Sequence, residues 1–216
     1  MKSTKDEVIK KIRECAILYN KNLVGKNVLF ITIGDNKPYY FETVFLPRNF
    51  LHFTGVKTSL NSTLFFRSAV NNKLSIDDIT ISTDGTTELK LLVLPTLMNI
   101  TKTARMVGNY DNSKSLLISD KFAGTVTSAM GFVETDNGYY IPNTVIKEDI
   151  RQITKRPQQK IAATFIKNQK DKKYTYLTYI AKGFTIDDNI FKDIFLKKID
   201  MENLNSKFEI PRSIIG

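Results

Sequence analysis

The chain is poor in the two residue types that most often hold metals or build disulfide frameworks. Cys15 is the only cysteine and His52 the only histidine among 216 residues. One cysteine excludes an intramolecular disulfide and a thiolate zinc cluster, which favours a reducing cytoplasm. A zinc or di-iron site would need carboxylate ligands, and the two Asp-Asp pairs are more typical of helix caps. We therefore expect a cytoplasmic protein with no metal and no cofactor.

Long apolar runs and common catalytic signatures are also missing. The most apolar segment, "LKLLVLPTLMNI", is shorter than the ~20 residues that span a bilayer, and charges interrupt the first 20 residues. No membrane partner is expected. The sequence contains no Walker A loop, no paired GxGxxG, no HExxH helix and no nucleophile elbow. The enzyme classes that depend on these motifs are therefore excluded.

Positive charge, in contrast, is abundant. The chain has 32 lysines and arginines against 22 acidic residues, a net charge of +10. This excess favours a polyanionic partner, because clustered cations release the counterions condensed on nucleic acid. Residues 147–173 carry nine cations against three acids. Six of the nine are predicted to bind nucleic acid: Arg151, Lys155, Arg156, Lys160, Lys172 and Lys173.

Three tyrosines follow this basic segment. Tyr174, Tyr176 and Tyr179 lie on the next predicted strand, and exposed aromatic rings beside cations suit base stacking and phosphate contact. A basic turn on an ordinary solvated face would show the same pattern. Both interpretations therefore stay open at the level of sequence.

The first half of the chain predicts three helical regions. Thr4 and Glu7 have capping-box spacing ahead of an apolar pattern with helical period. A second helix is predicted over residues 61–71. A third is predicted over residues 86–106, with a kink or a split at Pro95 because proline removes a backbone donor.

The strands of this half are predicted from β-branched and aromatic runs. "NVLFITI" and "YYFETVFL" are joined by a short turn and predict a hairpin. Pro47 ends the second run, so "FLHFT" is expected to form a third short strand or an edge. Side chains alternate along a strand, which would place His52 on one face with Phe50 and Thr54.

The second half predicts mainly strands. Asn137-Gly138 is the strongest hairpin signal in the chain, and "NQKDKK" predicts a second hairpin turn. Between them, "KEDIRQITKRPQQK" predicts a short helix and a basic connection. A final amphipathic helix is expected over residues 187–198. The predicted strands are "SLLIS", "AGTVTSAMGFVET", "GYYIPNTVI", "KIAATFIKN" and "YTYLTYIAK".

These elements predict an α+β protein in which helices pack on an antiparallel sheet of about four strands, with an additional N-terminal hairpin. We expect a single compact domain over residues 1–216. An internal boundary near residue 113 is the alternative. It would separate the helices and hairpin of 1–113 from the sheet of 114–186 and from the C-terminal helix and tail of 187–216.

His52 is the first candidate for chemistry. A lone histidine among aromatic residues is often a packed core or boundary residue, and that interpretation stays open. Metal-free RNA cleavage, however, needs only a base for the 2′-hydroxyl, an acid for the leaving oxygen and cations near the phosphate. Histidine is the side chain whose ordinary pKa lies near neutrality. Thr54 could donate a hydrogen bond, and Lys57 or Arg67 could offset phosphate charge.

Four segments, taken in order, carry a family resemblance: "FLPRNFLHFTGVK", "KFAGTVTSAMGFVE", "GYYIPNTVIKEDIR" and "TYLTYIAKG". The sequence resembles the phage-associated barnase, EndoU, colicin and RelE-like nuclease domains, in the subgroup with a His-Leu-Thr-Gly-like stretch. The resemblance implies a barnase/RelE-like α+β fold and metal-independent ribonuclease activity in phage, mobile-element or toxin settings. It carries over only the segment with His52 and Gly55, where Phe53 stands in place of the expected leucine.

The predicted function is therefore a metal-independent endoribonuclease that forms 2′,3′-cyclic phosphates. His52 would act as general base or acid, and Tyr176 would stack a base or donate a proton. The alternative is a non-catalytic module of the same fold that binds nucleic acid or protein. The expected partner is RNA or, as an alternative, DNA. A toxic nuclease would also need an inhibitor, whereas an accessory module would act on a host-factor protein.

Overall fold

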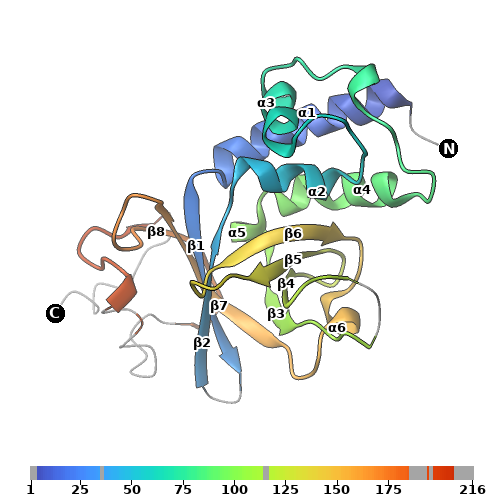
Figure 1. Ribbon diagram of the computed structural model, residues 1–216. Helices are drawn as coiled ribbons and strands as arrows, with labels where there is room; N and C mark the ends of the chain where they lie inside the picture. Colours follow the sequence, from blue (N-terminus) through green and yellow to red (C-terminus); the bar gives the residue numbers. More distant parts are fainter. Residues whose placement is uncertain (1–3, 35–36, 114–116, 185–193, 195–196, 207–216) are drawn as a thin grey trace.

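The computed structural model describes residues 4–34, 37–113, 117–184, 194 and 197–206. Figure 1 shows a layer of helices packed over one end of a strongly curved sheet. The protein is α+β, as predicted, and most strand pairs are antiparallel. The prediction of about four strands was wrong, because the described residues form a sheet of nine strands.

The structure confirms the first predicted helix and its capping box. α1 spans Lys5–Asn22. The hydroxyl of Thr4 accepts a hydrogen bond from the Glu7 amide at 3.3 Å, and the Glu7 carboxylate accepts one from the Thr4 amide at 2.8 Å. This reciprocal cap satisfies two amides that the helix leaves unpaired. One face of α1 is buried, and its residues are Val8, Ile9, Ile12, Cys15, Ala16 and Tyr19.

The predicted N-terminal hairpin is also present. β1 spans Lys26–Gly34 and β2 spans Lys37–Val44. β1 pairs on its other side with β7, Gln159–Asn168, along almost its whole length. Val28 and Phe30 enter the main core, whereas Leu29 and Ile31 enter a second core on the opposite face. The continuous apolar run of β1 therefore reflects a strand that is covered on both faces.

The histidine segment is a helix, so the predicted strand was wrong. A 3-10 turn, η1, spans Pro47–Asn49 and leads into α2, Phe50–Thr54. Helical spacing puts Phe50 and Phe53 together in the main core and leaves the His52 side chain exposed. His52 therefore does not share a face with Phe50 and Thr54. Two helix boundary signals flank the segment: Pro47 begins the 3-10 turn, and Gly55, in the left-handed conformation, follows the last residue of α2.

The other helices follow in the first half of the chain. α3 confirms the prediction for 61–71, and the Asn61 side chain caps it by accepting from the Leu64 amide at 2.9 Å. The region 86–106 is divided as expected, but the break comes after Leu97, two residues beyond Pro95. The last residue of the predicted helical region, Met106, is the first residue of a strand. The elements are α3 (Ser62–Val70), η2 (Ile76–Asp78), α4 (Thr86–Leu97) and α5 (Ile100–Thr103).

The second half confirms both predicted hairpins and the short helix, and it adds two strands. "AGTVTSAMGFVET" does not form one strand, because the Thr125 amide donates to Ser128 at 2.9 Å and turns the chain. In "SLLIS", the described residues 117–119 form no strand, and the helix predicted over 187–198 lies largely outside the described residues. The elements are β3 (Met106–Asn109), β4 (Lys121–Gly124), β5 (Ala129–Glu134), β6 (Tyr140–Ile146), α6 (Ile150–Ile153), β8 (Tyr176–Ile180) and β9 (Asn205–Ser206).

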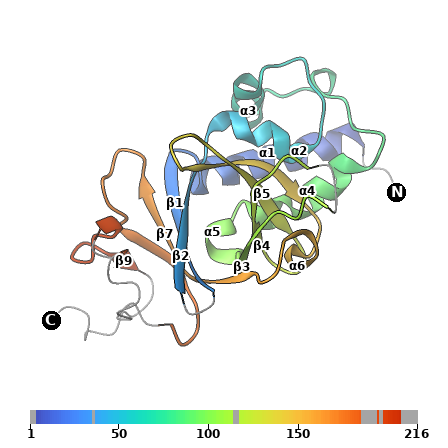
Figure 2. The ribbon, with the colours of Figure 1, turned by 60° about the horizontal axis from the view of Figure 1, so that its bottom comes forward.

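Seven of the strands close into a ring. β1 pairs with β2 and β7, β7 pairs with β3, and β3 to β6 form a meander whose last strand returns to β2. The pairing between β2 and β6 is short and parallel, and it places Thr43 opposite Tyr140. Figure 2 shows the lower part of the molecule, where α6 lies beside β3 and β4. The main core joins residues from Val8 to Ile161 between this ring and the helices.

Candidate functional site

His52 is exposed in the middle of α2, and this helix packs against α4 and β6. Figure 1 shows α2 and α4 side by side above β6. The Lys90 ammonium of α4 donates a hydrogen bond of 2.7 Å to the His52 carbonyl oxygen. Burial lowers the pKa of Lys90 from its ordinary value. The packing of two helices therefore places a partly desolvated cation beside the only histidine.

The turn after His52 is held by hydroxyl groups. Gly55 adopts a left-handed conformation with φ of 70°, and its carbonyl oxygen accepts hydrogen bonds of 2.8 Å from both Thr87 and Ser82. A Cβ atom at Gly55 would lie 3.1 Å from the Thr87 backbone. Glycine is therefore suited to this position both by its backbone angle and by the close approach of α4.

Thr87→Val should lower the free energy of unfolding by about 1–3 kcal/mol. Thr87 is fully buried. Its hydroxyl donates to Gly55 and accepts from the Ser82 amide at 3.1 Å, whereas valine keeps the shape and loses both bonds. Urea unfolding would measure the change. Thr87→Ser, which retains the hydroxyl, is the matched control, and equal losses in the two variants would contradict this assignment.

The structure gives Thr54 a local role. Its side chain is fully buried, donates to the Leu51 carbonyl at 2.8 Å and accepts from the Val56 amide at 3.4 Å. Both bonds lie within the turn that follows α2. A substrate in solvent does not reach this hydroxyl, so the predicted hydrogen bond from Thr54 to a phosphate is not supported.

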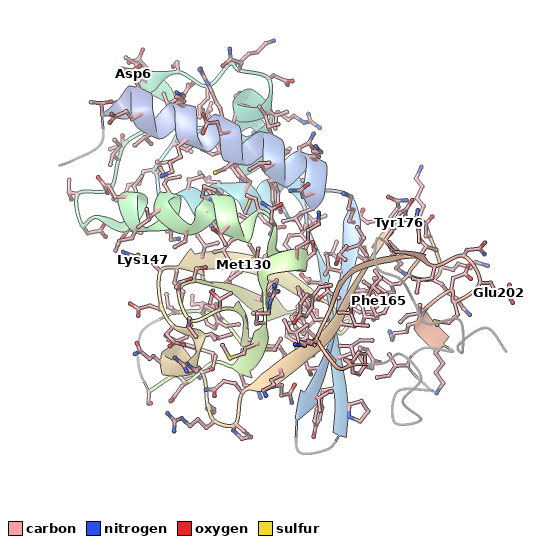
Figure 3. The ribbon with its side chains drawn as sticks, turned by 180° about the vertical axis from the view of Figure 1, so that it is seen from behind. Asp6, Met130, Lys147, Phe165, Tyr176 and Glu202 are labelled. Atoms are coloured by element: carbon pink, nitrogen blue, oxygen red, sulfur yellow. The ribbon has the colours of Figure 1, made fainter. Side chains whose placement is uncertain are left out.

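The remaining predicted residues of the site lie on different elements. Lys57 is exposed in the loop that follows α2, where its backbone pairs with Thr80. Its charge helps to lower the pKa of the Asp84 carboxyl, after the hydrogen bonds from Thr86. Arg67 is exposed on α3, which packs against α2. Tyr176 lies on β8, on another side of the molecule (Figures 1 and 3). The structure therefore places Lys90 at the backbone of His52 and Lys57 in the loop five residues further along the chain, whereas Tyr176 lies elsewhere.

The predicted nucleic-acid-binding cations do not form one patch. Arg151, Lys155 and Arg156 are exposed around α6, and Lys160 is exposed near the start of β7. Lys172 and Lys173 are exposed in the turn between β7 and β8, at the other end of β7. A ten-residue strand is about 30 Å long. The basic segment of the sequence is thus divided between two separate regions.

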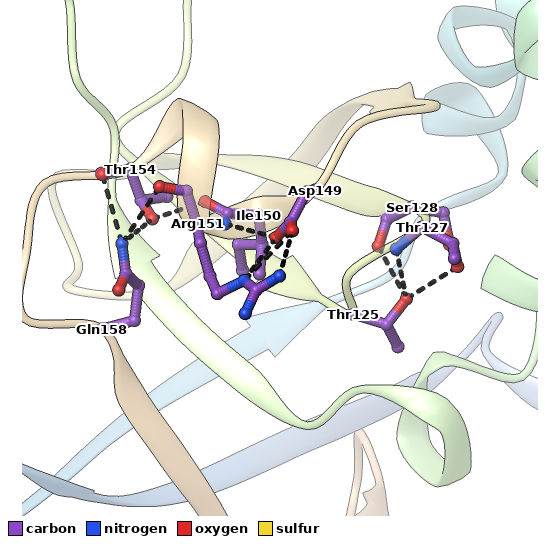
Figure 4. A network of polar contacts seen from close by, with 8 residues as sticks. All are labelled: Thr125, Thr127, Ser128, Asp149, Ile150, Arg151, Thr154 and Gln158. Carbon is purple, nitrogen blue, oxygen red and sulfur yellow. Dashed lines mark hydrogen bonds and ion pairs between the residues drawn. The ribbon is translucent and has the colours of Figure 1, made fainter.

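Arg151 is further constrained by its own neighbour. Figure 4 shows its guanidinium facing Asp149, with Nε 3.0 Å from Oδ1 and Nη2 2.6 Å from Oδ2. The same Asp149 side chain caps α6 through the Arg151 amide at 2.9 Å. The bonds from Arg151 hold the pKa of the Asp149 carboxyl below its usual range. A phosphate would have to compete with this carboxylate for Arg151.

The three tyrosines of the predicted stacking surface differ in exposure. Tyr174 is buried and donates to Glu42 at 2.9 Å. The Arg105 guanidinium lies over the Tyr179 ring, 4.2 Å from its centroid. Tyr176 is 45% exposed. Of the three rings, Tyr176 is therefore the one available to a base.

A second polar cluster lies at the start of β6, away from His52. The Lys121 ammonium donates to Asn109 at 2.7 Å and lies 5.3 Å from the centroid of the Tyr140 ring. The Tyr140 hydroxyl donates to Glu134 at 3.0 Å. Burial, followed by the neighbouring Glu134, raises the pKa of Tyr140 to about 12. Because these groups satisfy one another beside the pairing between β2 and β6, we interpret the cluster as structural.

The described residues contain neither a cluster of metal ligands nor a helix that could span a membrane. Within them, no group of three or more His, Cys, Asp and Glu side chains could hold a metal ion. Asp78 of the first Asp-Asp pair accepts from the Ser75 amide at 2.7 Å, as the cap interpretation predicted, while the second pair lies outside the described residues. Along the described chain, no helix has both the length and the apolar character needed to cross a membrane.

The sequence pattern did not indicate Lys90 as a site residue, because Lys90 lies 38 residues from His52 and carries no motif.

Comparison of the sequence with known proteins identifies the family of the chain. A family model described as phage-Barnase-EndoU-ColicinE5/D-RelE like nuclease4 matches residues 11–183. No curated protein and no solved structure matches the chain. The match covers His52 and Tyr176 and confirms the resemblance, and a nuclease family implies a nucleic-acid substrate. The chain belongs to the phage-Barnase-EndoU-ColicinE5/D-RelE like nuclease4 family.

Proposed function

We propose that this protein is a metal-independent endoribonuclease of phage or mobile-element origin that cleaves RNA through the ribose 2′-hydroxyl. The observation that carries the proposal is that His52 is exposed in α2, with the Lys90 ammonium 2.7 Å from the backbone carbonyl oxygen of His52. Membership of a nuclease-like family supplies the substrate class. A histidine enclosed in the core would instead have favoured a binding module without catalysis.

In the proposed reaction, His52 accepts the proton of the 2′-hydroxyl while that oxygen attacks the adjacent phosphorus. The bond from phosphorus to the 5′-oxygen breaks, and the departing oxygen takes a proton from solvent water at this exposed site. The products are a 2′,3′-cyclic phosphate and a 5′-hydroxyl. Positive charge from Lys57 and Lys90 favours the extra negative charge that develops on the phosphate.

The mechanism is tested with a short labelled RNA in excess EDTA. We expect cleavage that yields cyclic-phosphate and 5′-hydroxyl ends, because neither step requires a metal ion. A matched RNA with a single 2′-deoxyribose at the cleaved position should remain intact at that position. Cleavage of the deoxy substrate would show attack by water instead of the 2′-hydroxyl. Salt-sensitive RNA binding with no cleavage would identify a binding module.

A further inference from the structure

A cavity of about 400 Å³ lies between the C-terminal end of α1, the turn from α4 to α5, and strand β8. Figure 3 shows Tyr176 on β8 at this side of the molecule. Pockets for small ligands typically measure roughly 300–1,000 Å³ and combine apolar walls with a few polar groups. The residues that line it include Asn22, Lys26, Asn99, Lys102, Ile166 and Tyr176.

The charge of this cavity is positive. Lys26 and Lys102 both line it, and among the described lining residues there is no Asp or Glu. The Lys26 ammonium donates to the carbonyl oxygens of Lys21 at 2.7 Å and Asn22 at 3.1 Å, which fixes its position at the end of α1. Burial lowers the pKa of Lys26, and the nearby charge of Lys102 lowers it further. An anion between the two amines would relieve this repulsion.

One wall of the cavity can receive a flat aromatic group. Tyr176 is 45% exposed, although its strand neighbour Leu177 is buried. Across the strand pair, Tyr176 lies opposite Ile166, which also lines the cavity. A half-exposed ring beside an apolar side chain is a surface on which a nucleobase stacks.

Hydrogen bonds connect the elements around these groups. Asn22 donates through its side chain to the Met98 carbonyl and to Asn99, each at 3.1 Å, and so connects α1 to the turn before α5. Thr178 of β8 donates to the carbonyl oxygen of Thr101 in α5 at 3.0 Å. Hydrogen bonds therefore link the helix that bears Lys102 to the strand that bears Tyr176, while the Lys26 ammonium is held at the end of α1.

We propose that this cavity binds one nucleotide of RNA, with its phosphate between Lys26 and Lys102 and its base stacked on Tyr176. The choice of RNA rests on the proposed function, whereas the site itself is separate from His52. In this role Tyr176 holds substrate and takes no part in proton transfer.

The test is calorimetric titration of the full chain with a ribonucleoside 5′-monophosphate and, separately, with inorganic phosphate. Lys102→Ala should weaken binding of both ligands about tenfold or more. Tyr176→Ala should weaken the nucleotide about tenfold and leave phosphate unchanged, because only the nucleotide has a base to stack. Two exposed residues outside the cavity are matched controls, Lys10→Ala and Tyr39→Ala, and neither should change binding.

Binding of the nucleotide no tighter than phosphate, or equal affinity in wild type and Tyr176→Ala, would overturn the proposal, as would no binding at all. His52→Ala separates this site from the reaction, since it should retain nucleotide binding. If the wild type binds nucleotide in the expected pattern but never cleaves RNA, the proposed function fails and the nucleotide site stands. If the wild type cleaves RNA through His52 but binds no nucleotide in the cavity, the nucleotide site fails and the proposed function stands.

Discussion

His52→Gln should lower the rate of RNA cleavage about 10²–10⁴-fold, the usual contribution of a general acid or base. Glutamine keeps a polar side chain of similar length but cannot accept a proton near neutral pH. The fold should be unaffected, because the His52 side chain is exposed and the bond from Lys90 goes to its backbone oxygen. Single-turnover cleavage in excess EDTA measures the rate, and thermal unfolding measures the stability.

The matched control is Lys10→Gln on the exposed face of α1, which places the same new side chain outside the site. It should cleave RNA within about twofold of wild type, since an isolated surface substitution rarely shifts stability beyond about 0.5 kcal/mol. If His52→Gln cleaves as fast as this control, His52 takes no part in proton transfer. The catalytic group would then have to be sought elsewhere in the molecule.

Tyr19→Ala should lower the free energy of unfolding by about 3–5 kcal/mol, the range for removing a large buried aromatic side chain. Tyr19 is fully buried on α1, and its ring contacts four phenylalanines. Ring centroids lie 5.4 Å from Phe50 and 5.7 Å from Phe53, the two core residues of α2. The loss would be a large part of the roughly 5–15 kcal/mol that typically stabilises a domain.

The same substitution should also reduce cleavage below the unfolding temperature, because Tyr19 supports the helix that carries His52. Tyr19→Phe separates packing from hydrogen bonding. It retains the ring and removes the donor to the Leu46 carbonyl at 2.9 Å, so it should cost about 1–3 kcal/mol. Urea unfolding compares both variants with Tyr39→Ala, an exposed ring on β2. A Tyr19→Ala protein as stable as this control would contradict the packing described for α1 and α2.

Several elements could be predicted because their signals are local. The capping pair Thr4 and Glu7 predicted the start of α1, and Asn137-Gly138 predicted the hairpin of β5 and β6. These residues act on backbone atoms only a few positions away. The family resemblance also needed only the order of short segments along the chain.

The errors arose where a short segment fits two structures. "FLHFT" satisfies strand alternation, but Phe50 and Phe53 also have helical spacing, and the core around Tyr19 favours the helix. The turn from Thr125 to Ser128 contains no glycine or proline, so β4 and β5 were predicted as one strand. In both places the packing of neighbouring elements decided the structure, because the local preferences were nearly equal.

The sequence by itself determined the α+β class, the basic charge, the family and the identity of the single histidine. The tertiary structure decided which groups meet. It brought Lys90 to His52 across 38 positions and assembled Asn22, Lys102 and Tyr176 around one cavity. It also divided the basic segment between the two ends of β7. Composition and local pattern report the preferences of short segments, whereas a site depends on which distant segments bury their apolar faces together.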